Sequence, residues 1–183
     1  LALLRAAKPV SVWLADPATP AALRERLGLT QRMRDFAVSE LKLPDNASYR
    51  RFADLKRPAV LWNVVAAPEL SLRLKTWCFV AVGCIGYRGY FERGEAESYA
   101  AGLKAQALEV SVYGVPAYST LGRLPGDGLA DPLLNTFIGG SEGQVASMVF
   151  HELAHQVVFV GGDTTFNESF ATAVEREGVR RWL

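Results

Sequence analysis

Residues 150–159 read FHELAHQVVF and contain both histidines of the chain, His151 and His155, with Glu152 between them. Residues i and i+4 lie on the same face of an α-helix, so the two imidazoles can bind one metal ion. Glu152 lies about 100° round the helix from His151, which suits a carboxylate that takes a proton from an attacking water. The alternative is a buried core helix whose polar residues are satisfied by their neighbours, since each such group would cost roughly 1–3 kcal/mol without a partner. The spacing therefore predicts a catalytic metal site with one zinc ion.

A catalytic zinc site needs a third protein ligand, and the sequence has no third histidine. The acidic residues that follow the motif are Asp163, Glu168, Glu175 and Glu177. Residues 161–162 are both glycine and lie midway between His155 and Glu168, so an antiparallel helix pair would return Glu168 to the level of His155. We expect Glu168 to be the third ligand, although it could instead form a capping box with Thr165. Asp163 suits a helix cap, and Glu175, two turns beyond Glu168, could support the site.

The two cysteines, Cys78 and Cys84, are six residues apart in WCFVAVGC. They could be two buried apolar thiols, or a disulfide across a hairpin, which would imply an oxidising compartment. Cys84 is also an alternative third ligand, because a Gly-Cys pair ahead of an HExxH helix resembles the peptide deformylases. The residues after it, IGYRG, match that pattern poorly, and a disulfide would remove the thiol. A deformylase-like amide hydrolase using Cys84 remains the alternative enzyme.

The elements that must position these residues suggest an α+β fold. Helical patterns cover residues 20–41, 95–109, 141–160 and 166–178. Apolar, β-branched and aromatic runs predict strands at residues 59–66, 75–82 and 109–116. We expect Thr19 to cap the first helix, a break or bend near Gly28, a capping box of Ser141 and Gln144, and a surface connection over residues 44–55.

Composition narrows the class of protein. The 183 residues are 50% hydrophobic, which allows a sizeable core, and 20 basic against 19 acidic residues give a net charge of +1. The basic residues are scattered, so nucleic acid is not expected as a partner. No apolar run reaches the roughly 18–20 residues that span a bilayer. The chain begins at Leu1 rather than Met, and we expect it to be a fragment of a longer precursor.

HELAHQ followed by GDTTFNESFATAVEREG strongly resembles the predicted zinc aminopeptidase family of bacterial envelopes, a gluzincin-like group with HExxH and a downstream NExxA. The resemblance extends upstream through LPDNASYRRFADL, WNVVAAPELSL, TWCFVAVGCIGYRGYF and GVPAYSTLG, and so covers nearly the whole chain. It implies a single zincin-like metallopeptidase domain over residues 1–183, with an N-terminal helical part at 1–55. Residues 56–183 would form a small mixed or antiparallel sheet and a zinc-site helix packed against a ligand helix.

The resemblance also implies a chemistry and a location. His151, His155 and Glu168 would bind zinc, and Glu152 would be the general base of a peptide hydrolase. The protein would lie in the bacterial envelope, in the periplasm, and its precursor would have a lipoprotein signal, so the membrane would be contacted only through a lipid anchor absent from this chain.

The remaining site residues are predicted from their positions. Tyr118 or Tyr113 could donate a hydrogen bond to the oxyanion, from a strand to which a peptide substrate could add. Asn167 could contact the substrate backbone or cap a helix. An aminopeptidase also needs an acid that binds the substrate amine, and the candidates are Glu142, Asp163 and Glu175. A non-catalytic envelope protein with a structural metal site is the alternative of a different class.

Overall fold

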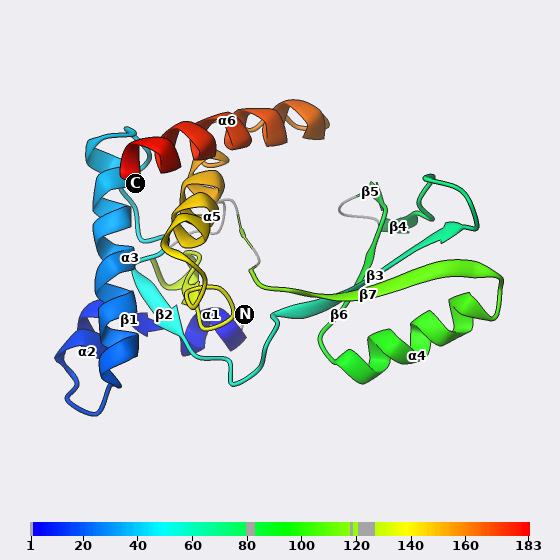
Figure 1. Cartoon of the computed structure of the whole chain (residues 1–183), viewed down its shortest axis with the longest axis horizontal. Coiled ribbons are helices and arrows are strands. Elements are labelled where there is room, and N and C mark those ends of the chain that lie inside the picture. Colours follow the sequence, from blue (N-terminus) through cyan, green and yellow to red (C-terminus); the bar gives the residue numbers. More distant parts are fainter. Residues whose placement is uncertain (1, 80–82, 118, 121–126) are drawn as a thin grey trace. The chain divides into compact units, whose positions relative to one another are not determined.

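The computed structural model describes residues 2–79, 83–117, 119–120 and 127–183 (Figure 1). The chain forms two compact units, one of Leu1–Lys56 with Tyr118–Leu183 and the other of Arg57–Ala117. Both mix helices with small sheets. This grouping differs from the predicted division after residue 55, because the N-terminal helices belong to the same unit as the helices of the HExxH region. None of the described helices has both the length and the apolar character needed to cross a membrane.

The first unit is mainly helical. Its helices are α1 (Ala2–Ala6), α2 (Val10–Ala15), α3 (Ala21–Ser39), α5 (Glu142–Ala154), α6 (Thr164–Trp182) and the short 3-10 helix η1 (Asp127–Leu129). A small mixed sheet joins β1 (Lys8–Pro9), β2 (Arg51–Ala53) and β8 (Leu133–Leu134), with β2 antiparallel to β1 and parallel to β8. Phe52 of β2 is 1% exposed and Phe150 of α5 is completely buried. Phe52 contacts the Trp13 ring of α2, and Phe150 contacts the Phe36 ring of α3, so α2 packs on the sheet and α3 packs on α5.

Four local predictions about this unit were wrong. Helix α3 runs through Gly28 without interruption, and its N-cap is Pro20 rather than Thr19. Helix α5 ends at Ala154, six residues before the predicted end, and turn residues follow. Residues 44–55 are not a surface connection, because they include strand β2 and the buried Tyr49.

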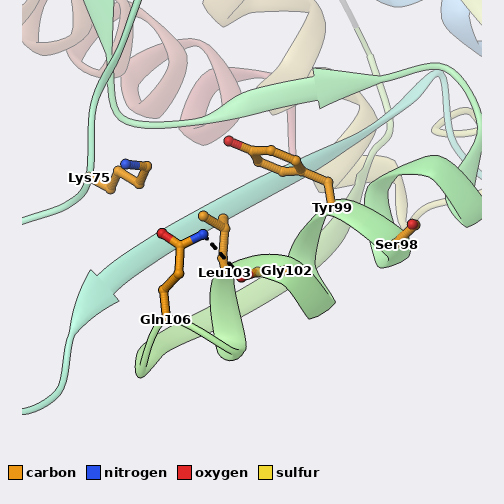
Figure 2. Close-up of a pocket in the computed structure, with 6 residues that line it drawn as sticks. All are labelled: Lys75, Ser98, Tyr99, Gly102, Leu103 and Gln106. Carbon is orange, nitrogen blue, oxygen red and sulfur yellow. Dashed lines mark hydrogen bonds between the residues drawn. The ribbon is translucent and has the colours of Figure 1, made fainter.

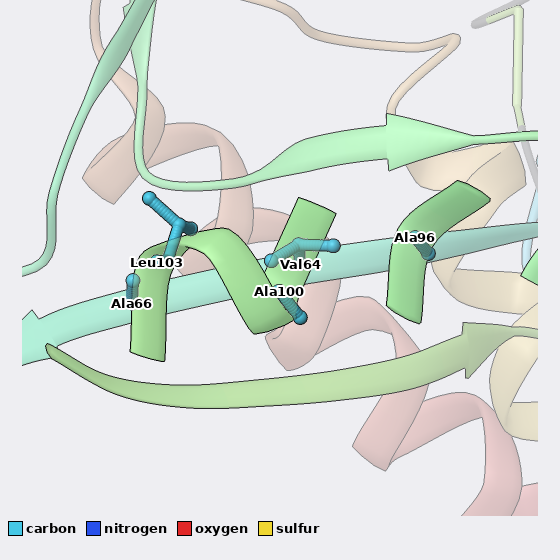
Figure 3. Close-up of a cluster of buried hydrophobic side chains, with 5 residues drawn as sticks. All are labelled: Val64, Ala66, Ala96, Ala100 and Leu103. Carbon is cyan, nitrogen blue, oxygen red and sulfur yellow. The ribbon is translucent and has the colours of Figure 1, made fainter. Parts of the chain in front are cut away.

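The second unit is a three-stranded antiparallel sheet covered by one helix. Strand β3 (Leu61–Pro68) lies between β6 (Arg88–Tyr90) and β7 (Leu108–Val115). Helix α4 (Arg93–Lys104) packs on this sheet, and its buried side chains meet those of β3, as Figure 3 shows; the cluster is Val64, Ala66, Ala96, Ala100 and Leu103. Along β7 partly buried and exposed residues alternate, as expected of a strand with one face on the core.

The hairpin of β4 (Trp77–Phe79) and β5 (Gly83–Ile85) also belongs to the second unit. It pairs Cys78 directly with Cys84, and a disulfide joins them. The spacing of the two cysteines allowed either two buried thiols or a disulfide across a hairpin, and the structure has the disulfide. Cys84 therefore has no thiol to offer a metal.

Candidate metal centre

Helix α5 brings the HExxH motif to the site. The helix begins with the predicted capping box, in which Ser141 and Gln144 satisfy each other's backbone N–H groups. Its fully buried residues Val149 and Leu153 face the core. His155 is the C-cap residue, and its φ of −60° and ψ of −21° keep it in helical conformation. The i, i+4 relation between the two histidines therefore survives although the helix ends there.

The chain then turns back into α6. Gly162 has a φ of +84°, a conformation that glycine adopts without steric cost. Asp163 caps α6 by accepting a hydrogen bond from the N–H of Phe166, as its position in the turn predicted. Asn167 accepts from the N–H of Val160 and donates to its carbonyl, both at 2.8 Å. These contacts close the turn that returns the chain to α5.

The contacts between α5 and α6 run in opposite directions along the two sequences, so the helices are antiparallel. Ser147 contacts Glu175, while His155 lies beside Glu168. The two backbones come close at Gly178, where an added Cβ would lie 2.8 Å from the Phe150 ring. Close packing at this glycine holds the ligand helix against the HExxH helix.

Three potential ligand atoms meet between these helices. The Nε2 atoms of His151 and His155 are 3.1 Å apart, and the nearest Glu168 oxygens lie 3.2 Å from the former and 3.6 Å from the latter. Ligands in a tetrahedron at zinc bond lengths of about 2.0–2.2 Å are about 3.3–3.6 Å apart. In the described residues, His151, His155 and Glu168 can together hold a metal ion. The antiparallel turn thus brings together the three residues that the sequence singled out.

Glu175 determines how His151 faces this cluster. Its Oε2 lies 2.8 Å from His151 Nδ1, and its Oε1 accepts a hydrogen bond from the Ser147 hydroxyl. A carboxylate at Nδ1 favours the proton on that nitrogen, which leaves Nε2 with a lone pair. Nε2 of His151 can then give its lone pair to a cation, and Nε2 of His155 and the Glu168 carboxylate offer further donor atoms within 3.1–3.6 Å. The donor set therefore fits a metal ion.

Glu152 lies beside the cluster in a partly buried position. Burial raises the pKa of its carboxyl, while a hydrogen bond with Ser119 and the two nearby histidines act in the opposite direction. Asp131, whose charge is also nearby, raises the pKa further. The groups that act on the pKa of Glu152 are thus a serine hydroxyl, two imidazoles and a second carboxyl, and their effects oppose one another.

Three neighbours of Glu152 were not predicted from the sequence, namely Tyr49, Ser119 and Asp131. Tyr49 is 3% exposed, and burial raises the pKa of its hydroxyl well above the usual value, with smaller contributions from Glu152 and Asp131. Its φ of 62° lies in the left-handed region, which is uncommon for a bulky residue. Strain of this kind collects at functional sites. No motif or periodic spacing in the sequence marks them as neighbours of Glu152.

The segment that carries Tyr49 is held in place by a buried arginine. Arg34 is completely buried, and its guanidinium donates to the carbonyls of Ser48 and Asn46. Burial and the charge of Arg50 lower its pKa to about 10. Asn46 and Ser48 in turn hydrogen-bond the side chain of Gln156, the residue after His155. The segment is therefore fastened both to α3 and to the end of the HExxH helix.

Other predicted site residues do not join the cluster. Asn167 is 2% exposed, and its side-chain amide is hydrogen-bonded to the backbone of Val160, which agrees with the second of its two predicted roles, at the start of a helix. Tyr113 is half exposed on β7 of the second unit. Tyr118 lies outside the described residues. Glu142 accepts a hydrogen bond from the Trp182 indole at the far end of α5.

The second unit has a hollow between the end of α4 and the chain at Lys75 (Figure 2). Its lining is Lys75, Ser98, Tyr99, Gly102, Leu103 and Gln106. The Gln106 amide donates to the Gly102 carbonyl, which closes the helix end. No histidine or carboxylate is among these residues, so this hollow offers a metal ion nothing comparable to the α5–α6 cluster.

One comparison with known proteins decides the family. A family model described as "Putative aminopeptidase" matches residues 1–183. The chain belongs to this family. Neither a curated protein nor a solved structure matches the chain. The family name indicates a peptide hydrolase, in agreement with the predicted class of enzyme.

Proposed function

We propose that this aminopeptidase-family chain is a zinc-dependent peptide hydrolase with a zincin-like domain. The observation that carries the proposal is the convergence of His151, His155 and Glu168 at distances of 3.1–3.6 Å, with Glu152 next to them. Two imidazoles and one carboxylate form a ligand set used by catalytic zinc sites in peptidases. Bound zinc would lower the pKa of a water molecule and polarise the substrate carbonyl.

The protein's own residues divide the remaining work. Glu152 accepts a proton from the attacking water and delivers it to the leaving amine. Glu175 holds the His151 ring in one orientation through Nδ1. Glu142, Asp163 and Glu175, the acids predicted to bind a substrate amine, each already accept a hydrogen bond within the protein.

A structural metal site remains the second candidate. Structural zinc sites are closed by four protein ligands, whereas the described residues group three around this point. Three ligands leave a position for water or substrate, and this supports the catalytic role. An envelope location is also part of the proposal, supported by the Cys78–Cys84 disulfide, because such bonds persist in oxidising compartments.

Metal analysis and a peptide digest test the proposal together. The zinc-loaded protein should bind one ion per chain and cleave a peptide library, and comparison of free with N-acetylated peptides separates exopeptidase from endopeptidase action. Glu152→Gln should keep zinc but lose activity by about 10²–10⁴-fold. Glu168→Ala should lose zinc, with the exposed Glu177→Ala as its matched control. Full activity in Glu152→Gln would refute the role of the base, and four protein ligands in a zinc-bound crystal structure would favour the structural site.

A further inference from the structure

The two histidines of the HExxH motif are held in different ways. His151 has a Glu175 carboxylate oxygen 2.8 Å from its Nδ1. His155 is 6% exposed, and its buried Nδ1 has no hydrogen-bond partner among the described residues. A histidine that binds metal usually donates its second ring N–H to a carboxylate, a carbonyl or water, and this bond fixes the ring. Within the described part of the chain, the position of His155 must therefore depend on packing and on its backbone.

The backbone at His155 is the end of a helix. Helix α5 ends at Ala154, and His155 is its C-cap residue. The N–H of Gln156 donates to the Leu153 carbonyl at 3.1 Å, and that of Val157 donates to the Ala154 carbonyl at 2.9 Å. These bonds span three residues, as in the tight last turn of many helices, and such turns fray more readily than a helix interior. A metal ligand at this place needs a further contact to stay in position.

The side chain of Gln156, the residue after His155, makes such a contact. Its Oε1 accepts a hydrogen bond from Asn46 Nδ2 at 2.7 Å, and its Nε2 donates to the Ser48 hydroxyl at 3.2 Å. Both ends of one amide group are thus bound to a segment that lies 110 and 108 residues earlier in the sequence. The last turn of the HExxH helix is fastened at the residue next to the ligand.

The segment that receives Gln156 is itself fixed from within the core. The completely buried Arg34 donates to the backbone carbonyls of Asn46 at 3.2 Å and Ser48 at 3.0 Å. The Asn46 side-chain oxygen accepts from the Ser48 N–H at 3.0 Å and from Arg34 Nη2 at 3.3 Å. Because these donors occupy the oxygen, the amide nitrogen of Asn46 is the group left to face Gln156. The contact therefore joins Gln156 to a rigid support.

We propose that Gln156 is a positioning residue for His155, as Glu175 is for His151. Glu175 acts on the ring through Nδ1, whereas Gln156 acts on the backbone by holding the last helical turn against Asn46 and Ser48. The proposal rests on the function proposed above, because His155 is taken as a metal ligand. Ligands must be held within about 0.5 Å of the geometry that the metal requires. Loss of the Gln156 contacts should thus weaken metal binding although all three ligands remain.

Zinc binding by the full chain, measured in competition with a fluorescent chelator, tests this role. Gln156→Met keeps the length of the side chain and removes both hydrogen bonds, so zinc binding should weaken by about tenfold. Asn46→Ala, at an exposed position, is a second variant that breaks the same contact. The double variant should bind zinc as the weaker of the two single variants does, because both changes act through one contact.

Gln106→Met is the matched control and should keep its zinc affinity, since this exposed residue in the second unit donates only to the Gly102 carbonyl among its described contacts. Thermal unfolding of the metal-free proteins shows which variants are folded, and Asn46→Ala gives the same test if Gln156→Met is not. A zinc affinity of Gln156→Met within about twofold of the original, or losses that add in the double variant, would overturn the proposal.

A second measurement needs neither metal nor activity. The chain has only two histidines, so nitrogen-detected NMR spectra of the metal-free protein contain the imidazole signals of His151 and His155 alone. In Gln156→Met the His155 signals should shift or broaden, while those of His151, held through Glu175, change much less. Unchanged His155 signals would overturn the positioning role whatever the activity. The expected change in a protein that binds no zinc or cleaves no peptide would support the positioning role and refute the proposed hydrolase alone.

Discussion

Glu175 provides a quantitative test of the metal centre, because it touches His151 but is not one of the three ligands. Its Oε2 is 2.8 Å from His151 Nδ1, and its Oε1 accepts from Ser147. Residues that hydrogen-bond a metal-ligating histidine typically contribute 10–100-fold to metal affinity, which is about 1.4–2.7 kcal/mol. Glu175→Ala removes the hydrogen bond and the charge, so we expect about 100-fold weaker zinc binding. Glu175→Gln can still accept from Nδ1 and donate to Ser147, so we expect about tenfold.

Competition with a fluorescent zinc chelator measures both dissociation constants. Glu177→Ala is the matched control, since this exposed residue on the same helix pairs only with Arg180 among its described contacts. Thermal unfolding of the metal-free proteins shows whether the variants stay folded. A zinc affinity of Glu175→Ala within twofold of the original would show that His151 does not bind metal through Nε2 while Glu175 accepts a hydrogen bond from Nδ1. The orientation assigned to the whole cluster would then be wrong.

Three further predictions concern stability and the disulfide. Gly178→Ala should lower the free energy of unfolding by about 1–3 kcal/mol in urea titrations, because the new methyl would lie 2.8 Å from both Leu41 and Phe150; a neutral result would mean that the two helices separate easily. Cys84→Ser should destabilise the protein by about 2 kcal/mol in the same assay, the loop-closure value for so short a loop, and should leave zinc content unchanged, whereas lost zinc would restore Cys84 as a ligand. Burial raises the pKa of Asp131 above 3.8, so the folded state keeps a proton that the unfolded chain loses; the resulting stability is present at low pH and disappears as pH rises through the raised pKa. Between about pH 4 and pH 7, the free energy of unfolding should therefore fall less in Asp131→Asn than in the original protein. Urea titrations of both proteins in a zinc chelator measure this pH dependence, and an equal dependence in the two proteins would contradict the raised pKa of Asp131.

The metal-binding part of the site was largely predictable because its information is local. The spacing of His151 and His155 requires only one helical turn, and the capping box at Ser141 starts that helix. The glycine pair at residues 161–162 indicated the turn, and the distance from it to Glu168 indicated where the returning helix would place a carboxylate. The zincin-like fold, the periplasmic location and the peptide substrate remain predictions.

The environment of Glu152 was not predictable in the same way. Tyr49, Ser119 and Asp131 are 103, 33 and 21 residues from Glu152 in the sequence, and no periodic pattern relates them. Residues 44–55 were taken for a surface connection because polar and turn-forming residues dominate there. The buried Arg34 reverses that assignment, since it satisfies the carbonyl groups of this segment from within the core.

The sequence by itself determined that two imidazoles share a helix face, that a carboxylate lies between them and that the chain can turn back with Glu168. These features depend on helix geometry and on the conformational freedom of glycine, both of which act over a few residues. Only the tertiary structure decided that Glu175 lies behind His151 and that Ser119 and Asp131 lie beside Glu152. Such contacts depend on how separate segments pack around a common core, and a buried polar group finds its partners only when that packing is complete.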